Sequence, residues 1–424
     1  MKIINSIILP IIPILVYFDF PGTSLGLNMF LCLIIFINSI VILLREKNKN
    51  IIWNQWFLFL CLIIVVNVSV VVIKYNNVSF FSIIYLFINL FTIWIISSKN
   101  EIFINKKIYI LSLIILSLCS IGIYCAQWLV FVITKKTFSG MIPFLEISDS
   151  FSKIEATKGV YLVSNGSSSN SFCSFFSEPS HFAMFLLPPL HFLYIYKKRK
   201  WYYLAIAIVL FLTIMSTRSG NGIIGLFILS FLDVCYDSEI EKRRKKIILT
   251  IISISLLSIF AISWLIPSFR EMYLRLFVAT EQGYSKAGYR IYRGFTIFFN
   301  LPVGNAIYGL GYSQITRFME TNSFVTMFDY DSGSVEYVNF ICQMMIYFGL
   351  VGFLTFVGFY IDIFRNCDNC SKPLLILLSF FFLSCSMLFD YFFMFYFFSA
   401  IVSNRNANNQ KAFENASLQY CLEI

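Results

Sequence analysis

The sequence predicts an all-α, polytopic integral membrane protein with about 12 transmembrane helices, or as few as about 10, and one large outer-face loop. Composition is the first reason, because 58% of the 424 residues are hydrophobic and 13% are charged. A soluble domain carries about 25% charged residues. The second reason is that apolar runs of about 20 residues, long enough to cross the hydrocarbon core, recur along the whole chain.

The N-terminal part, residues 1–133, is expected to form about five membrane helices, because short polar turns separate its apolar runs. Its apolar start lacks a small-residue cleavage site, so we interpret it as a first span and not as a removed signal peptide. A first outer loop, rich in Ser and Gly, follows at 134–171.

Residues 172–266 are expected to contain about four further membrane helices, numbers six to nine. The middle two, helices seven and eight, are short, and the polar segment 216–222 lies between them. Helices that stop inside the membrane are tolerated where the backbone lines a protein-buried or wet cavity. The short broken pair is therefore a candidate floor for a site.

The next interval, residues 267–336, is the large outer loop of about 70 residues, and structureless loops longer than about 15 residues are usually functional or disordered. Residues 337–403 are expected to form the C-terminal membrane helices. The apolar run 373–402 is too long for one comfortable span, so we split it near Asp390. Residues 404–424 are interpreted as a cytoplasmic tail.

Basic residues gather in short loops, which the positive-inside rule assigns to the cytoplasm. If the expected spans alternate, the clusters at 45–49, 99–107, 197–200 and 242–246 all fall on one side. Both long loops and the site then face outward, in a bacterial cytoplasmic membrane. The net charge of +10 has this origin, and no separate basic domain exists to bind nucleic acid.

Arg218, in the break between the two short spans, is the first candidate, because an arginine inside a membrane is costly unless it faces an anion or a carboxylate. The alternative interpretation is that Arg218 is an interfacial arginine in an ordinary turn. Glu178 opens the sixth span, where it either pairs with an arginine, accepts a proton, or simply favours the helix dipole. His181 lies one turn further, with a structural role as its alternative.

The segment Tyr289-Arg290-Ile291-Tyr292-Arg293 is the second candidate. If it is helical, Arg290 and Arg293 share a face, and a guanidinium fork suits phosphate oxygens. A plain solvated face is the alternative. Tyr289 and Tyr292 either stack on sugar rings or anchor the helix at the interface. We expect an amphipathic helix around Arg290 to fold back over the membrane.

Gly304, Gly309 and Gly311 follow in the large loop, where glycine lets the backbone approach a ligand closely. The acidic residues that end the loop, including Glu336, do not complete a calcium loop. We therefore expect no metal and no cofactor. A lipid-carried substrate fits an outer-face site better than a nucleotide sugar does.

Several short motifs follow in order between residues 177 and 350. They are SEPS at 177–180, STRSGNGIIG at 216–225, Arg290, LPVG at 301–304, GLG at 309–311, and Asn339 ahead of YFGLVG at 347–352. In this order the chain resembles polysaccharide polymerases of the Wzy type, in the wider O-antigen polymerase and ligase superfamily.

The resemblance implies a GT-C-like fold and metal-independent glycosyl transfer from polyprenyl diphosphate-linked oligosaccharides, which serve as donor and acceptor. It assigns Arg218 and Arg290 to the diphosphate, with Arg293 in support. Glu178 would orient the arginines or deprotonate the acceptor, and Glu336 is the other candidate base. A chain-length regulator and a flippase of the same pathway are the implied partners, besides the bilayer.

Two alternatives stay open. Ligases of the superfamily usually carry a histidine just before the Asn that Asn339 matches, but Val338 stands there and no histidine follows His191. A lipid-linked oligosaccharide flippase would have similar length and charge. It should show two similar halves and charged central spans, and the sequence shows neither.

Overall fold

The structure, a computed structural model, describes most of the chain, and the described residues form helices and a few very short strands. They are 1–20, 26–45, 54–75, 80–98, 100–136, 140, 142, 145–147, 160–161, 171–196, 201–238, 240–265, 286–322 and 338–404. The strands form two antiparallel pairs, β1 (Phe18–Asp19) with β2 (Glu146–Ile147) and β3 (Val160–Tyr161) with β4 (Ser171–Phe172). The predicted all-α class is confirmed.

Apolar helices make this a multi-pass membrane protein. Within the described ranges, four are long enough to cross a bilayer: α2 (Leu27–Arg45), α3 (Gln55–Tyr75), α6 (Lys106–Thr134) and α16 (Phe340–Asn366). The shorter apolar helices are α1 (Lys2–Leu15), α4 (Phe80–Ser98), α9 (Trp201–Ser216), α10 (Gly220–Tyr236), α17 (Lys372–Ser384) and α18 (Tyr391–Ser403). With them run α5 (Asn100–Phe103), α8 (Pro179–Tyr196) and α11 (Lys242–Leu265).

One end of the bundle, here called the basic end, carries both the start of α1 and the end of α18. The Lys106 ammonium donates to the carbonyl of Asn404 (3.0 Å), and the Asn105 amide donates to Ser6 Oγ (2.6 Å). Lys245, from the basic run that opens α11, donates to the carbonyl of Cys235 at the end of α10 (2.8 Å). Lys106 and Lys245, which belong to two of the predicted basic clusters, therefore lie at helix ends where the expected alternation puts them.

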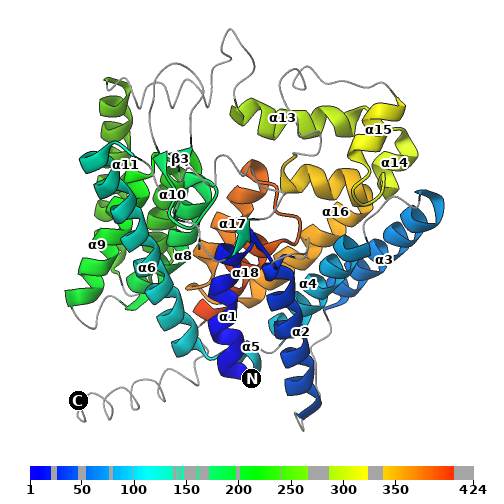
Figure 1. The fold of residues 1–424 in the computed structure, drawn as a ribbon, viewed down its shortest axis with the longest axis horizontal. Coiled ribbons are helices and arrows are strands. Elements are labelled where there is room, and N and C mark those ends of the chain that lie inside the picture. The colour runs from blue at the N-terminus through cyan, green and yellow to red at the C-terminus, as the bar shows by residue number, and fades with distance from the viewer. Residues whose placement is uncertain are drawn as a thin grey trace.

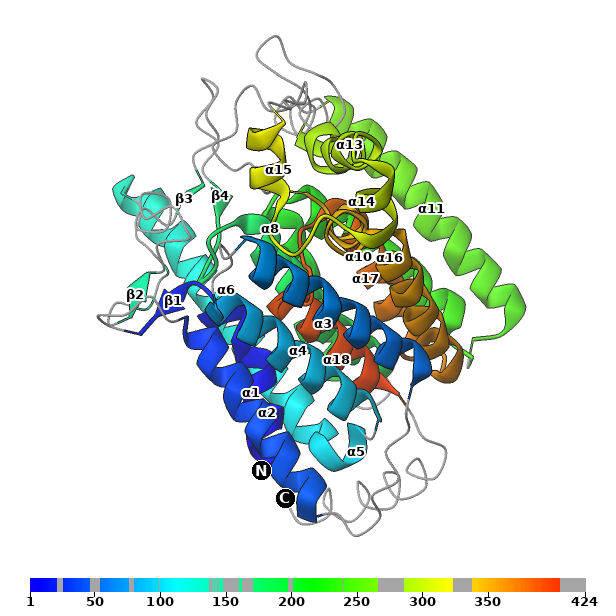
Figure 2. The same cartoon turned by 90° about the vertical axis from the view of Figure 1, so that its right-hand side faces the viewer.

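Three helices cross the opposite end of the bundle, at the top of Figures 1 and 2, and together form what we call the cap. They are α13 (Lys286–Phe299), α14 (Val303–Tyr308) and α15 (Ile315–Thr321). The helix expected around Arg290 is present as α13. It packs closely on α16, since a Cβ added at Gly294 would lie 2.5 Å from the Cβ of Cys342.

A kink in α16 at Gly349 joins the cap to the bundle. Gly349 has φ of 71°, so the helix breaks there and frees carbonyl groups of the preceding turn. The amides of Leu310 and Gly311 donate to the carbonyls of Ile346 (2.7 Å) and Tyr347 (3.2 Å). Because lipid offers no water to such groups, these bonds allow the break.

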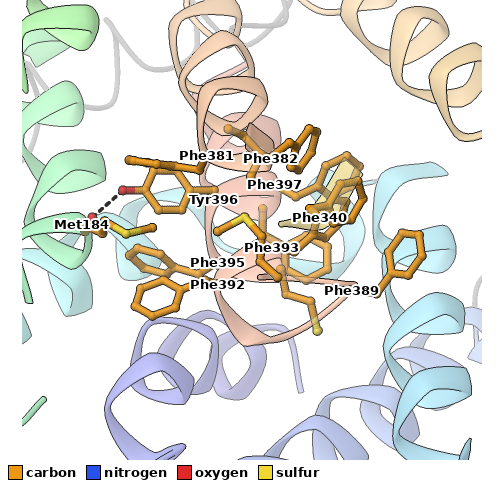
Figure 3. Close-up of a cluster of buried hydrophobic side chains, with 14 of the residues drawn as sticks. Met184, Phe340, Phe381, Phe382, Phe389, Phe392, Phe393, Phe395, Tyr396 and Phe397 are labelled. Atoms are coloured by element: carbon orange, nitrogen blue, oxygen red, sulfur yellow. Dashed lines mark hydrogen bonds between the residues drawn. The ribbon is translucent and has the colours of Figure 1, made fainter. Parts of the chain in front are cut away.

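Aromatic rings fill the centre of the bundle, where α16, α17 and α18 meet (Figure 3). Phe340 stacks on Phe382 with ring centroids 4.2 Å apart, and Phe393 lies parallel to both rings. The Tyr396 hydroxyl donates to the carbonyl of Met184 on α8. Between helices in lipid, dispersion contacts and interhelical hydrogen bonds replace the hydrophobic effect as the source of packing energy.

We predict that Gly349→Ala destabilises the protein by more than about 2 kcal/mol. Left-handed backbone costs a non-glycine residue roughly 1–2 kcal/mol, and the new Cβ would also collide with the carbonyl oxygen of Ile307. Thermal unfolding of the purified protein in detergent measures the change. Gly304→Ala is the matched control, because nothing lies within 4 Å of a Cβ there. Equal midpoints for the two variants would contradict the prediction.

Candidate functional site

Several helices end together at the opposite pole from the basic end, around the turn between α17 and α18 (385–390), here called the α17–α18 turn. The Phe340 amide, at the start of α16, donates to the carbonyl of Cys385 (2.9 Å). Gln343 donates to Ser386 Oγ (2.7 Å), and Asn221, at the start of α10, donates to Cys385 Sγ (3.4 Å). The turn thus joins the N-terminal ends of α10, α16 and α18.

The sequence predicted a break near Asp390, and the structure has it there. Asp390 caps α18, with Oδ1 accepting from the amides of Phe392 (2.9 Å) and Phe393 (3.0 Å). From α4, Asn89 donates to the carbonyl of Phe389 (2.9 Å). The two short helices run antiparallel, because Ser403 at the end of α18 donates back to Ser371, just before α17 (3.3 Å).

Glu178 and His181 lie at the start of α8, next to the start of α18. Glu178 precedes Pro179, the first residue of α8, and its Oε2 accepts from Ser180 Oγ (2.9 Å). His181 Nδ1 is 2.8 Å from the Tyr17 hydroxyl, and its ring centroid lies 5.1 Å from that of Phe392. The N-terminus of α8 therefore joins the same group of helix ends.

Arg218 lies in the tight turn between α9 and α10, with its side chain exposed to the surroundings of the bundle. Its φ of 54° is in the left-handed region, which is uncommon for a residue other than glycine. Ser219 caps α10 by accepting from the Gly222 amide (3.1 Å). Gly222 in turn packs against Ala183 of α8, so the Arg218 turn lies beside the start of α8.

Of the two arginines in α13, the structure describes the side chain of Arg293 and not that of Arg290. The side chains of Tyr289 and Arg290 lie outside the described residues, although both are within the helix. Arg293 is fully buried, with Nη2 3.8 Å from Met319 Sδ of α15, while Tyr292 is 62% exposed. Arg293 thus links two helices of the cap, which its spacing from Arg290 did not reveal. Its contact with a substrate stays a prediction.

Asn339 connects the cap to α16. Its Oδ1 accepts from the Cys342 amide (2.9 Å), which caps α16, and its Nδ2 donates to the carbonyl of Ile291 in α13 (3.5 Å). Asn339 is completely buried. The other residue predicted near this point, Glu336, lies outside the described residues.

Of the three loop glycines Gly304, Gly309 and Gly311, the last two pack closely against other parts of the protein. Gly309 and Gly311 have positive φ, and a side chain at either position would meet α16 or α3. Asn67 of α3 fixes the same segment, since its Oδ1 accepts from the Tyr312 amide (3.1 Å). Gly304 is exposed on α14. Packing against the bundle explains why positions 309 and 311 are glycine, while the contact of Gly309 and Gly311 with a ligand stays a prediction.

Polar residues that were not candidates also come together here. The Tyr17 hydroxyl interacts with Tyr391 as well as with His181, and Asn28 donates to the Tyr85 hydroxyl (3.2 Å). Tyr85 and Tyr391 both lie close to Asp390. One signal was readable, since Asp390 is the only acidic residue of the run 373–402. That pattern predicts a helix break but does not by itself indicate a site.

At the basic end, His191 joins three elements. Its Nε2 donates to the carbonyl of Cys370 (2.9 Å), and its Nδ1 lies 2.6 Å from Asp233 Oδ1, within hydrogen-bond distance. This links α8 to α10 and to the turn before α17.

Cys367 lies in the turn before α17, where burial raises the pKa of its thiol to about 11. The thiol is therefore protonated at neutral pH and unreactive.

Comparison with protein-family models and with curated proteins gives no match to this chain.

We predict that Arg218→Gly is more stable than Arg218→Ala by about 1 kcal/mol. Both substitutions remove the guanidinium group, but only glycine adopts a φ of 54° without steric cost. Thermal unfolding of the two purified variants under the same detergent conditions compares them directly. A lower midpoint for the glycine variant would show that this turn does not have the left-handed conformation.

Proposed function

We propose that the protein is a polysaccharide polymerase with about 12 membrane spans and a GT-C-like arrangement. It joins polyprenyl diphosphate-linked oligosaccharide repeat units into a surface polysaccharide, an O-antigen or capsule, on the outer face of the bacterial cytoplasmic membrane. The observation that carries the proposal is the meeting of four helix N-termini, those of α8, α10, α16 and α18, beside Arg218 and beneath the cap.

This arrangement suits a diphosphate. Helix N-termini carry partial positive charge and favour anions, and because the Asp390 carboxylate already accepts from the first amides of α18, the other helix starts have the larger part in this. Arg218 adds a full charge three residues before Asn221, which contacts the α17–α18 turn. Asn339 ties α13, and with it the backbone of Arg290, to the other side of the same turn. Two arginines on separate elements can then hold one diphosphate from two sides.

The chemistry follows from where charge develops. A sugar hydroxyl of the acceptor attacks the anomeric carbon of the donor, and the bond to the diphosphate breaks. The departing diphosphate gains negative charge, so guanidinium groups held in place stabilise the transition state more than the ground state. Arg218 and Arg290 have this role, and Arg293 holds the cap that carries Arg290. Glu178 orients the arginines, and no metal or other cofactor enters the reaction.

Position within the membrane explains the substrate class. The polyprenyl chains of donor and acceptor stay in the bilayer, and their diphosphate groups lie at its surface. A chain-length regulator and a flippase would act on the same lipid-linked units. The segment with Gly304, Gly309 and Gly311 would lie over the sugars, with Tyr289 and Tyr292 beside it.

We predict that Arg218→Gly and Arg290→Ala each lower surface polymer at least about 100-fold and leave single repeat units, because one lost transition-state contact costs that much. The variants are expressed in a strain that lacks the gene, and glycans are resolved on gels. Arg218→Gly isolates the charge, since the glycine suits the turn. Arg244→Ala is the control, because it removes an exposed arginine at the basic end.

The untransformed deletion strain tests the class of protein. Single repeat units on its surface mean a polymerase, whereas repeat units trapped inside the cell mean a flippase. Polymer that lacks its final acceptor means a ligase. Full-length polymer from both arginine variants would overturn the site assignment.

A further inference from the structure

Asp390 combines a fixed position with an available oxygen. Its Oδ1 accepts from the amides of Phe392 and Phe393, which holds the carboxylate at the start of α18. None of the described residues donates a hydrogen bond to its Oδ2, and the side chain is only partly buried. One oxygen therefore anchors the group, and the other is available to a ligand.

Two rings that carry hydroxyl groups lie near Asp390. Tyr85 from α4 and Tyr391 lie close to the carboxylate, and both are half-buried. Tyr391 interacts with Tyr17, which also approaches Glu178. Aromatic faces with a few convergent polar groups are the usual lining of a site for a small polar molecule. Such a site suits a sugar, which offers apolar C–H faces and hydroxyl groups.

The position of Asp390 relative to the arginines fits a two-sided site. Asp390 ends the α17–α18 turn, and Cys385 begins it with a contact to Asn221, three residues after Arg218. The same turn contacts the first residue of α16, whose cap Asn339 reaches α13. A carboxylate thus lies on the element that separates the Arg218 turn from the cap.

We propose that Asp390 is the general base that activates the acceptor sugar, which lies against Tyr85 and Tyr391. This inference rests on the proposed polymerase function, for which the reaction above names no general base. The acceptor oxygen forms a bond to the anomeric carbon, and the bond from that carbon to the diphosphate oxygen breaks. The electron pair leaves with the diphosphate, and the hydroxyl proton moves to Asp390 Oδ2 and then to water.

Glu178 has a different environment, which explains why it is not the base. Its Oε2 already accepts from Ser180, and the Tyr17 hydroxyl interacts with Tyr391, the residue that follows Asp390, as well as approaching Glu178. In this arrangement Glu178 has the positioning role proposed above, and its Oε2 is held by Ser180 at the start of α8. We therefore expect the amide variants of Asp390 and Glu178 to differ in how much polymer they make.

The test is Asp390→Asn in the deletion strain, with polymer length and single repeat units resolved on gels. Asparagine caps a helix as well as aspartate does, so the start of α18 stays formed while the base is lost. We expect polymer to fall at least about 100-fold, with single repeat units in its place and with an unfolding midpoint equal to that of the wild type. Asp390→Ser also keeps a cap without a carboxylate, and it should behave in the same way.

Two controls separate the possible failures. Asp362→Asn makes the same chemical change on α16, where Asp362 accepts from Asn54 (2.6 Å), and polymer should be retained. Glu178→Gln should retain at least about a tenth of the polymer, since a positioning carboxylate contributes less than a base. Full polymer from Asp390→Asn, with single repeat units in the deletion strain, would overturn Asp390 as the base and leave the polymerase standing. A deletion strain without surface single repeat units would overturn both.

Discussion

Backbone groups that a helix break releases inside a bilayer must find partners in the protein, and the architecture depends on how two such breaks meet this need. The kink at Gly349 exposes carbonyls of α16, and the segment after α14 supplies the amides that bind them. The α17–α18 turn interrupts what would be one long span, and side-chain amides from α4, α10 and α16 contact it. Each break is therefore also a junction between distant parts of the chain.

These junctions place the candidate site. Because Asn221 and Gln343 both contact the α17–α18 turn, the starts of α10 and α16 cannot separate without breaking polar contacts in lipid. Each such contact contributes about 0.6 kcal/mol on average in membrane proteins. The sum is small beside the packing energy of the aromatic rings below. The contacts matter more for alignment, since they hold the Arg218 turn, Asp390 and the cap in one arrangement.

Hydropathy and charge predicted most of the helices, because a bilayer sets the length of an apolar run and the side on which basic residues lie. The break at Asp390 was predicted from the length of its apolar run, and the helix at Arg290 from the expectation of an amphipathic segment that folds back over the membrane. The burial of Arg293 was not, because helical spacing says which residues share a face but not what packs on that face. The environment of Asp390 was also missed. Tyr85, near Asp390, comes from α4, and Tyr17, which interacts with Tyr391, follows α1. Both are more than 300 residues away along the chain, and no local pattern joins them.

The contact between Gly309 and Gly349 has an evolutionary consequence. Each glycine occupies the space that a side chain of the other backbone segment would need, since a Cβ at Gly349 would meet the amide of Gly309, and one at Gly309 would meet the carbonyl of Tyr347. A substitution at one position cannot be repaired by a change at the other, because both also have left-handed φ. Divergent relatives with this fold should therefore retain both glycines even where the surrounding helices have exchanged every apolar residue. The pair, 40 residues apart, is therefore a constraint that an alignment of such relatives can test.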